Sequence, residues 1–315
     1  MSLQRSALRK GNNEYLKVHG GGGGGEYETR IKVKDYKIFY DPRCDTFMDL
    51  LLSFASELVG TAAFIFLATG AIYSFFFVTG EPSNPSVVDE ETFVVAIAFG
   101  LALTAAFNAT NCISGGGLNP VVTFVAMFMG KLTVVRAIIY TIAQLVGGIL
   151  GSAFVLSITP GYIKAYTDYE KYAGCTILNS NLSLGFGVWV ETLLTFIFTL
   201  VIALTVIDPI DKGMKTESHN FFRSLIPGVT LSALMLVGYP LTGCSLNPAR
   251  SLGPAIIASY YSNFGIYWAG PYAGACITVV VYWVLLLFMI DKRRDFVYGN
   301  DRIEIRAKNP EAGNN

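Results

Sequence analysis

The chain has 315 residues, of which 52% are hydrophobic and only 15% are charged, and its formal net charge at pH 7 is zero. A soluble domain carries about 25% charged residues, so this composition argues against a soluble globular protein. The balanced charge gives no sign of a nucleic-acid partner, and we expect none.

Long apolar segments follow one another along most of the chain. Each is long enough to cross a hydrocarbon core of about 30 Å, which takes roughly 20 helical residues. The first begins behind a charged arm and is too long for a cleaved signal peptide. We therefore predict an integral, multi-pass protein of the lipid bilayer, with spans at residues 47–79, 92–110, 132–158, 184–207, 221–241 and 264–290.

Lys and Arg are divided unequally between the two sides of these spans. The N-terminal arm up to residue 47 carries nine and the tail from residue 291 carries six, whereas the opposite side carries only Lys164 and Lys171. Because positive residues stay in the cytoplasm, we place both termini there. Asn181 begins a glycosylation sequon in a predicted outer loop, which makes it a candidate glycosylation site and the chain a candidate glycoprotein.

Residues for metal binding or catalysis are not grouped in this sequence. Both histidines, His19 and His219, lie outside the predicted spans, and the five cysteines show no metal-ligand spacing. Only Cys175 falls in a predicted outer loop, so we expect no disulfide framework. We predict no enzyme, no metal and no cofactor.

Two copies of one motif indicate an internal repeat. Residues 114–124 read SGGGLNPVVTF and residues 242–252 read TGCSLNPARSL. Glu57 precedes the first copy and Glu191 the second, each in the first span of a three-span half. An odd number of spans inverts the second half relative to the first, and inverted repeats are typical of channels and transporters. We therefore divide the channel domain, 47–291, into repeats 47–158 and 184–291.

Each Asn-Pro pair predicts the start of a short helix. Asn is a preferred N-cap and Pro a preferred first helical residue, which applies to Asn119-Pro120 and to Asn247-Pro248. A helix from Asn119 to Met129 would be roughly 16 Å long and would cross about half of the bilayer core. The glycine-rich segments before both motifs would then be non-helical backbone at membrane depth, which is tolerated only inside protein or along water. A water-filled path is the simplest interpretation.

The chain resembles the aquaporin (major intrinsic protein) family over roughly residues 48–290. The features that carry the resemblance are the paired Asn-Pro motifs, the arginine after the second motif, and the glutamates of spans one and four. It resembles the water-selective branch in particular. The resemblance implies an all-α membrane protein, a right-handed bundle of six transmembrane helices plus two re-entrant half-helices in an inverted repeat. It also implies a homotetramer in the plasma membrane, with a pore in every subunit for water and, in some members, glycerol or other small neutral solutes.

The two asparagines and the arginine are the first candidates for the pore. Asn119 and Asn247 would offer N–H groups to a passing water at the midplane, although both could serve as helix caps alone. Arg250 is a charge at membrane depth, where charges are costly and usually functional. By their match to the family's filter, we add Phe99, Met235 and Cys244 to the selectivity filter.

Met235 departs from the pattern of the family that the chain resembles. Typical water channels have His at this position and glycerol channels have Gly, whereas Met offers an apolar wall and no donor. The small Cys244 and the Ser251 after the arginine favour water. We interpret Glu57 and Glu191 as structural acceptors for bare backbone amides, in preference to a proton relay.

The segments outside the bundle are candidates for gating. The arm of residues 1–46 contains six consecutive glycines, which are typical of a flexible linker. It is interpreted as a disordered extension, a cytoplasmic gate that uses tyrosines, or a tail that binds partners. The tail of residues 292–315 is a second cytoplasmic segment. The loop of residues 208–220 is a candidate site for phosphorylation and for pH sensing. The candidate gating residues are Tyr15, Tyr27, Tyr36, Thr216, Ser218 and His219.

These observations predict a passive water channel that excludes protons and ions and is gated at the cytoplasmic side. A broader pore for glycerol, peroxide or ammonia is the alternative that Met235 allows. A closed or adhesive tetramer that does not conduct is a further alternative. A coupled transporter is disfavoured because the predicted spans have few acidic residues besides Glu57 and Glu191.

Overall fold

The computed structural model describes residues 7–10, 13–20, 27–33, 46–79, 85–159, 174–207 and 217–286. The chain forms two units, Met1–Cys44 and Asp45–Asn315. The first is the N-terminal arm and the second contains the helical bundle.

The arm contains three strands, β1 (Ala7–Lys10), β2 (Asn13–Gly20) and β3 (Tyr27–Val33). They form one antiparallel sheet in the order β1-β2-β3, in which Leu16 is opposite Ile31. In β3, apolar residues fall at odd positions and charged residues at even ones, a period of two that favours a strand. The prediction of a flexible arm rests on the glycine run, of which residues 21–25 lie outside the described residues, so it stays a prediction.

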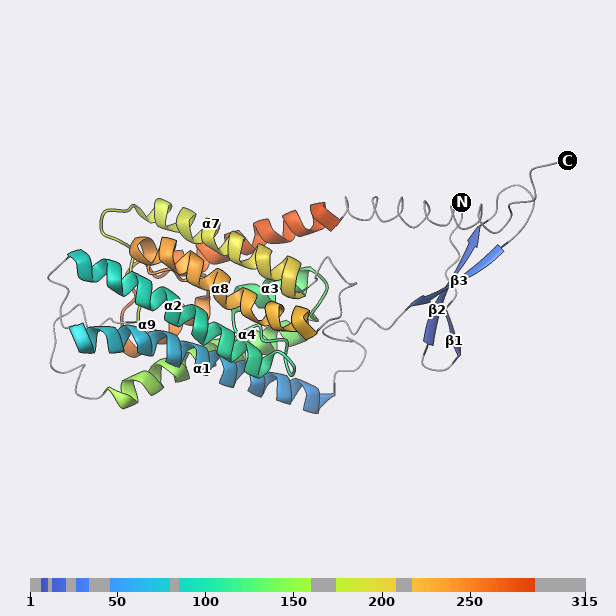
Figure 1. Ribbon diagram of the computed structural model, residues 1–315, viewed down its shortest axis with the longest axis horizontal. Helices are drawn as coiled ribbons and strands as arrows, with labels where there is room; N and C mark the ends of the chain where they lie inside the picture. The colour runs from blue at the N-terminus through green and yellow to red at the C-terminus, as the bar shows by residue number, and fades with distance from the viewer. Residues whose placement is uncertain are drawn as a thin grey trace. The chain divides into compact units, whose positions relative to one another are not determined.

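Among the described residues of the second unit, six helices are long and apolar enough to cross a membrane, which agrees with the six predicted spans. Successive helices run in opposite directions along the bundle (Figure 1). We call the end at which α1 begins the proximal end and the opposite end the distal end. The helices are α1 (Phe47–Thr79), α2 (Pro85–Thr110), α4 (Val134–Ile158), α7 (Leu184–Ile202), α8 (Glu217–Thr242) and a last helix, Ile266–Leu286. A π-helical turn, η1 (Ala203–Ile207), continues α7.

Small residues bring the helices of each repeat into close contact. A Cβ on Gly147 of α4 would lie 2.5 Å from the backbone oxygen of Leu58 on α1. In the second repeat, a Cβ on Gly270 would lie 2.5 Å from the Glu191 Cβ on α7. Closely packed glycines of this kind let membrane helices approach backbone to backbone. The two pairs occupy equivalent places in the two halves, which supports the predicted repeat.

Two short helices complete the bundle, α3 (Pro120–Phe128) and α9 (Pro248–Ala258). Figure 1 shows α3 toward the proximal end and α9 toward the distal end. Both begin at an Asn-Pro pair, and the side chains of Asn119 and Asn247 cap them. The Asn119 Oδ1 accepts from the Val121 N–H at 3.0 Å, and the Asn247 Oδ1 accepts from the Ala249 N–H at 2.9 Å. The half-helices therefore start where the sequence predicts them.

Candidate pore and selectivity filter

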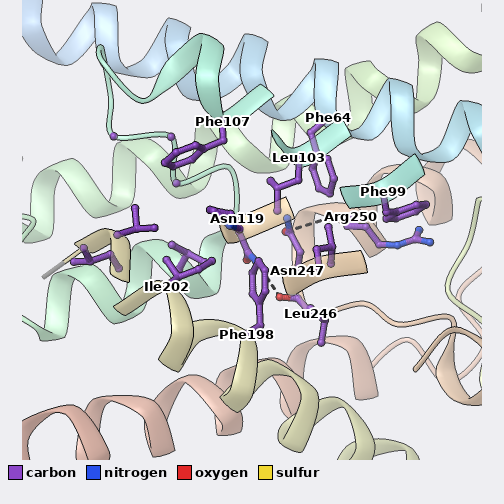
Figure 2. A pocket seen from close by; sticks show the side chains of 18 of the residues that line it. Phe64, Phe99, Leu103, Phe107, Asn119, Phe198, Ile202, Leu246, Asn247 and Arg250 are labelled. Atoms are coloured by element: carbon purple, nitrogen blue, oxygen red, sulfur yellow. Dashed lines mark hydrogen bonds between the residues drawn. The ribbon is translucent and has the colours of Figure 1, made fainter. Parts of the chain in front are cut away.

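The two asparagines tie the half-helices together at the middle of the bundle. The Asn119 Nδ2 donates to the Leu246 backbone oxygen at 2.9 Å, and the Asn247 Nδ2 donates to the Leu118 backbone oxygen, also at 2.9 Å. Figure 2 shows the two side chains next to each other. Because an amide nitrogen has two N–H groups, each asparagine keeps one for another acceptor.

Unusual backbone angles turn these carbonyls toward the opposite asparagine. Leu118 and Leu246 have φ of 48° and 53°, in the left-handed region that residues other than glycine rarely adopt. Both stand directly before an asparagine cap. Such strain persists only where the surroundings hold it, and it is often found at functional sites.

Two buried glutamates hold the strained segments. Glu57 of α1 accepts from the Gly117 N–H at 2.9 Å and from the Leu118 N–H at 2.7 Å. Glu191 of α7 accepts from the Ser245 N–H at 2.9 Å and from the Leu246 N–H at 3.1 Å. The bare amides before each half-helix thus find acceptors inside the protein, as buried backbone groups must.

A narrow cavity passes the two asparagines. Its volume of about 50 Å³ is enough for a few water molecules. Phe107, Val206 and Pro227 line the proximal part, and Phe99 and Arg250 line the distal end. Asn119 and Asn247 are the polar side chains at its middle (Figure 2). The other lining side chains are mainly aromatic and aliphatic, and the loops before the half-helices contribute Gly115, Gly116, Gly117 and Ser245.

Arg250 is held at the distal end of the cavity by its neighbours. Its guanidinium lies over the Phe99 ring, with Cζ 4.9 Å from the ring centroid, and its Nη1 donates to the Gly174 backbone oxygen. The Arg250 side chain is buried, and its Nε and Nη2 have no hydrogen-bond partner among the described residues. Two donors of a permanently charged group are thus left for a molecule in the cavity.

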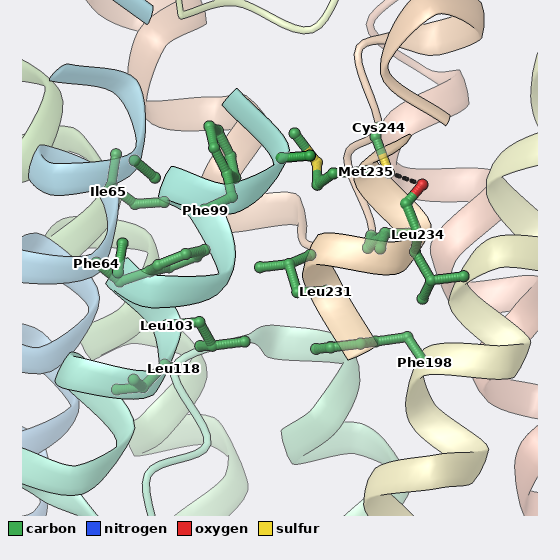
Figure 3. Close-up of a cluster of buried hydrophobic side chains, with 14 of the residues drawn as sticks. Phe64, Ile65, Phe99, Leu103, Leu118, Phe198, Leu231, Leu234, Met235 and Cys244 are labelled. Carbon is green, nitrogen blue, oxygen red and sulfur yellow. Dashed lines mark hydrogen bonds between the residues drawn. The ribbon is translucent and has the colours of Figure 1, made fainter. Parts of the chain in front are cut away.

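Met235 and Cys244, the other predicted filter residues, lie beside this end. Both are buried in the apolar cluster that contains Phe99, and Figure 3 shows Met235 projecting from α8 toward Phe99. The Cys244 Sγ is 3.6 Å from the Leu234 backbone oxygen. Neither residue is among those that line the cavity in the described part of the chain. Close by, burial raises the pKa of the Cys175 thiol to about 12, although the charge of Arg250 opposes the shift.

The remaining predicted site residues lie away from the cavity or beyond the described residues. Asn181 is exposed in a turn before α7. Tyr15 and Tyr27 lie in β2 and β3, and the backbone of Ser218 and His219 belongs to the start of α8. Tyr36 and Thr216 lie outside the described residues.

Several cavity residues were not predicted from the sequence, although the repeat contained a signal for two of them. An offset of 134 residues relates Glu57 to Glu191, and the same offset relates Phe64 to Phe198. Both phenylalanines line the cavity. The Gly174 carbonyl that holds Arg250 has no such signal, because a backbone acceptor can come from any residue type.

Comparisons with known proteins agree with this architecture. The family model "Major intrinsic protein" matches residues 46–282. The chain is 33% identical over 249 residues to a protein from Arabidopsis thaliana described as probable aquaporin TIP3-2. This match covers 77% of this chain and 86% of the relative. It is 33% identical over 232 residues to aquaporin-5 of Ovis aries, with 73% of this chain and 79% of the relative covered.

A solved structure has the same fold. The crystal structure of the aquaglyceroporin from Plasmodium falciparum matches with a TM-score of 0.66 and 25% identity, covering 77% of this chain and 99% of that one. Six membrane-capable helices and two half-helices around a cavity define a multi-pass membrane protein of the channel type. The chain belongs to the major intrinsic protein family, the aquaporins.

Proposed function

We propose that this protein is a passive, water-selective channel that excludes protons and ions. The observation that carries the proposal is the cavity that runs from the Phe99–Arg250 pair past Asn119 and Asn247. Its volume suits molecules of the size of water, and its apolar walls leave the few polar groups to decide what passes. The relatives described as aquaporins support the same function.

The asparagines would interrupt proton transfer along a file of water. Each has one N–H group beyond its bond to the opposite loop. A water that accepts from both asparagines is held with its hydrogens pointing outward, so it cannot pass a proton through the midplane. The positive ends of α3 and α9 point at the same water and repel cations.

A broader pore for glycerol, peroxide or ammonia is the second candidate, and Met235 is the observation that favours it. Met235 is buried beside Phe99 and offers neither a donor nor an acceptor strong enough to replace those of water. A flexible apolar wall adapts to solutes of different shape. The likeness to a solved aquaglyceroporin is compatible with this candidate.

Swelling and shrinking of proteoliposomes distinguish the two candidates. Water permeability is measured by stopped-flow light scattering after an osmotic step, and glycerol entry by reswelling in an isosmotic glycerol gradient. We expect water permeability well above that of empty vesicles and glycerol entry close to theirs. Glycerol entry as fast as water flow would reject water selectivity, and vesicles with no added permeability would favour a closed or adhesive protein.

Orientation, assembly and regulation follow as further parts of the proposal. The positive residues of the arm and tail would keep the proximal end in the cytoplasm and the distal end outside. Large apolar side chains that are exposed on the bundle, such as Leu101, Val146 and Trp189, would face lipid or neighbouring subunits of a homotetramer. The arm, the tail and the loop before α8 would regulate the cytoplasmic mouth, and the plasma membrane is the proposed location.

A further inference from the structure

Two helical stripes lead from the cavity to the distal end of the bundle. On α2, Phe99, Leu103 and Phe107 line the cavity at intervals of four residues. On α8, Pro227 and Leu231 do the same. Residues four apart share a helix face, and Figure 3 shows Leu103 and Leu231 on the facing sides of the two helices.

Both stripes continue beyond the filter with the same spacing. Val95 and Glu91 follow Phe99 on α2, and Met235 and Tyr239 follow Leu231 on α8. Val95 is fully buried and Tyr239 packs against the same apolar cluster as Met235. Near the distal ends of α2 and α8, beyond the filter residues, a carboxylate and a phenol therefore lie on adjoining sides of the two helices.

These two groups are bonded to each other across the helices. The Tyr239 hydroxyl donates to the Glu91 Oε1 at 2.6 Å. Glu91 is only 3% exposed. A carboxylate can accept about four hydrogen bonds, and Tyr239 is its one hydrogen-bond partner in the part of the chain that the structure describes. A buried carboxylate with unused lone pairs needs further donors, and an entering solute can supply them.

The filter next to this pair presents the unpartnered side-chain donors of Arg250. Arg250 has two donor nitrogens without a hydrogen-bond partner among the described residues. Met235 packs beside Phe99 in the apolar cluster and supplies no strong acceptor. A water molecule that accepts from Arg250 still has two O–H groups to place, and losing their hydrogen bonds on entry would slow it.

We propose that Glu91, held by Tyr239, is a specificity-determining residue that accepts a hydrogen bond from the molecule about to enter the filter. It supplies, about one helical turn outside Met235, the polar contact that the methionine cannot give. The inference rests on the proposed function as a channel for water. It favours small solutes with O–H or N–H donors, and it disfavours anions.

The test compares water permeability of proteoliposomes that contain equal amounts of folded protein. Glu91→Leu removes the acceptor, and we expect about threefold to tenfold lower permeability, the range for one lost hydrogen bond. Glu91→Gln retains an acceptor oxygen and should lie between Glu91→Leu and the unmodified protein. Glu90→Leu is the matched control, because Glu90 is an exposed neighbour on the same turn and its loss should change little.

A second substitution separates this role from a structural one. Adding Met235→His to Glu91→Leu restores a polar group to the filter, so at least half of the lost permeability should return. Equal permeability of Glu91→Leu and Glu90→Leu would overturn the proposal. A loss that Met235→His does not restore would also overturn it and assign Glu91 to helix packing.

If Glu91→Leu does not fold, Tyr239→Phe provides the same comparison. It removes the hydroxyl that holds the carboxylate, and we expect about twofold lower permeability. Full permeability of Tyr239→Phe would overturn the role of the pair. The unmodified protein is measured first, and permeability equal to empty vesicles at that stage would reject the proposed water channel itself.

Discussion

Arg250 combines a full charge, a buried position and two unpartnered donor nitrogens in one side chain. At an effective dielectric constant near 20, a charge about 5 Å away from a passing cation raises its energy by about 3 kcal/mol. That is enough to exclude most cations from a single-file pore. The Phe99 ring and the Gly174 carbonyl fix the guanidinium in place.

Removing this charge should open the pore to cations. We expect Arg250→Leu to raise proton or methylammonium entry into proteoliposomes by about tenfold or more, as followed with an internal pH-sensitive dye. Arg250→Lys retains the charge without the fork of donors and should keep cations out. Equal entry for the Leu and Lys variants would mean that the charge is not the barrier.

Cys175 offers a direct check on burial beside the filter. Its thiol has a pKa of about 12, above the ordinary value near 9, because burial disfavours the thiolate. Since the thiolate is the reactive form, maleimide labelling at neutral pH should be slow and should rise about tenfold per pH unit until the pKa is reached. Exposed Cys112 is the control within the same chain. Peptide mass spectrometry that finds Cys175 labelled as fast as Cys112 would contradict the buried position.

At the scale of elements, the contact between α4 and α9 depends on two glycines. A Cβ on Gly148 would collide with the Ala249 backbone oxygen, and a Cβ on Gly253 would collide with the Gly148 backbone oxygen. Backbone atoms cannot rotate away as side chains can, so α9 would have to move. The start of α9 carries Asn247 and Arg250, and its displacement would disturb the pore as well as the packing.

We therefore expect Gly148→Ala to lower stability by about 1–3 kcal/mol, the usual cost of overpacking. Thermal unfolding in detergent should show a lower midpoint, and water permeability should fall. Gly185→Ala is the control, because nothing lies within 4 Å of a Cβ at that position. A Gly148→Ala protein as stable as Gly185→Ala would mean that the half-helix adapts without cost.

Much of the bundle could be predicted because its signals are local. The six spans follow from apolar length, and the half-helices follow from the capping preference of Asn and Pro. The partners that complete the site are not local. Gly174 reaches Arg250 through its backbone, and Glu91 meets Tyr239 across 148 residues of sequence.

At the scale of the whole molecule, the inverted repeat explains why the site lies at the centre. Each half supplies one capped half-helix, one glutamate and one asparagine, and each asparagine bonds to the loop of the other half. Neither half closes the pore alone. Each asparagine is thus partnered by a backbone carbonyl of the other half and keeps one further N–H group.

The N-terminal arm provides a test at this scale. Met1–Cys44 and Asp45–Asn315 form separate units, so deletion of residues 1–44 should leave the helical unit folded. We expect the shortened protein to have an unfolding midpoint within a few degrees of the full chain and water permeability within about twofold of it. Stopped-flow measurement of both proteins in the same vesicles, at matched protein content, decides the outcome. A rise of about fivefold or more on deletion would instead assign the arm to a gate that holds the resting pore closed.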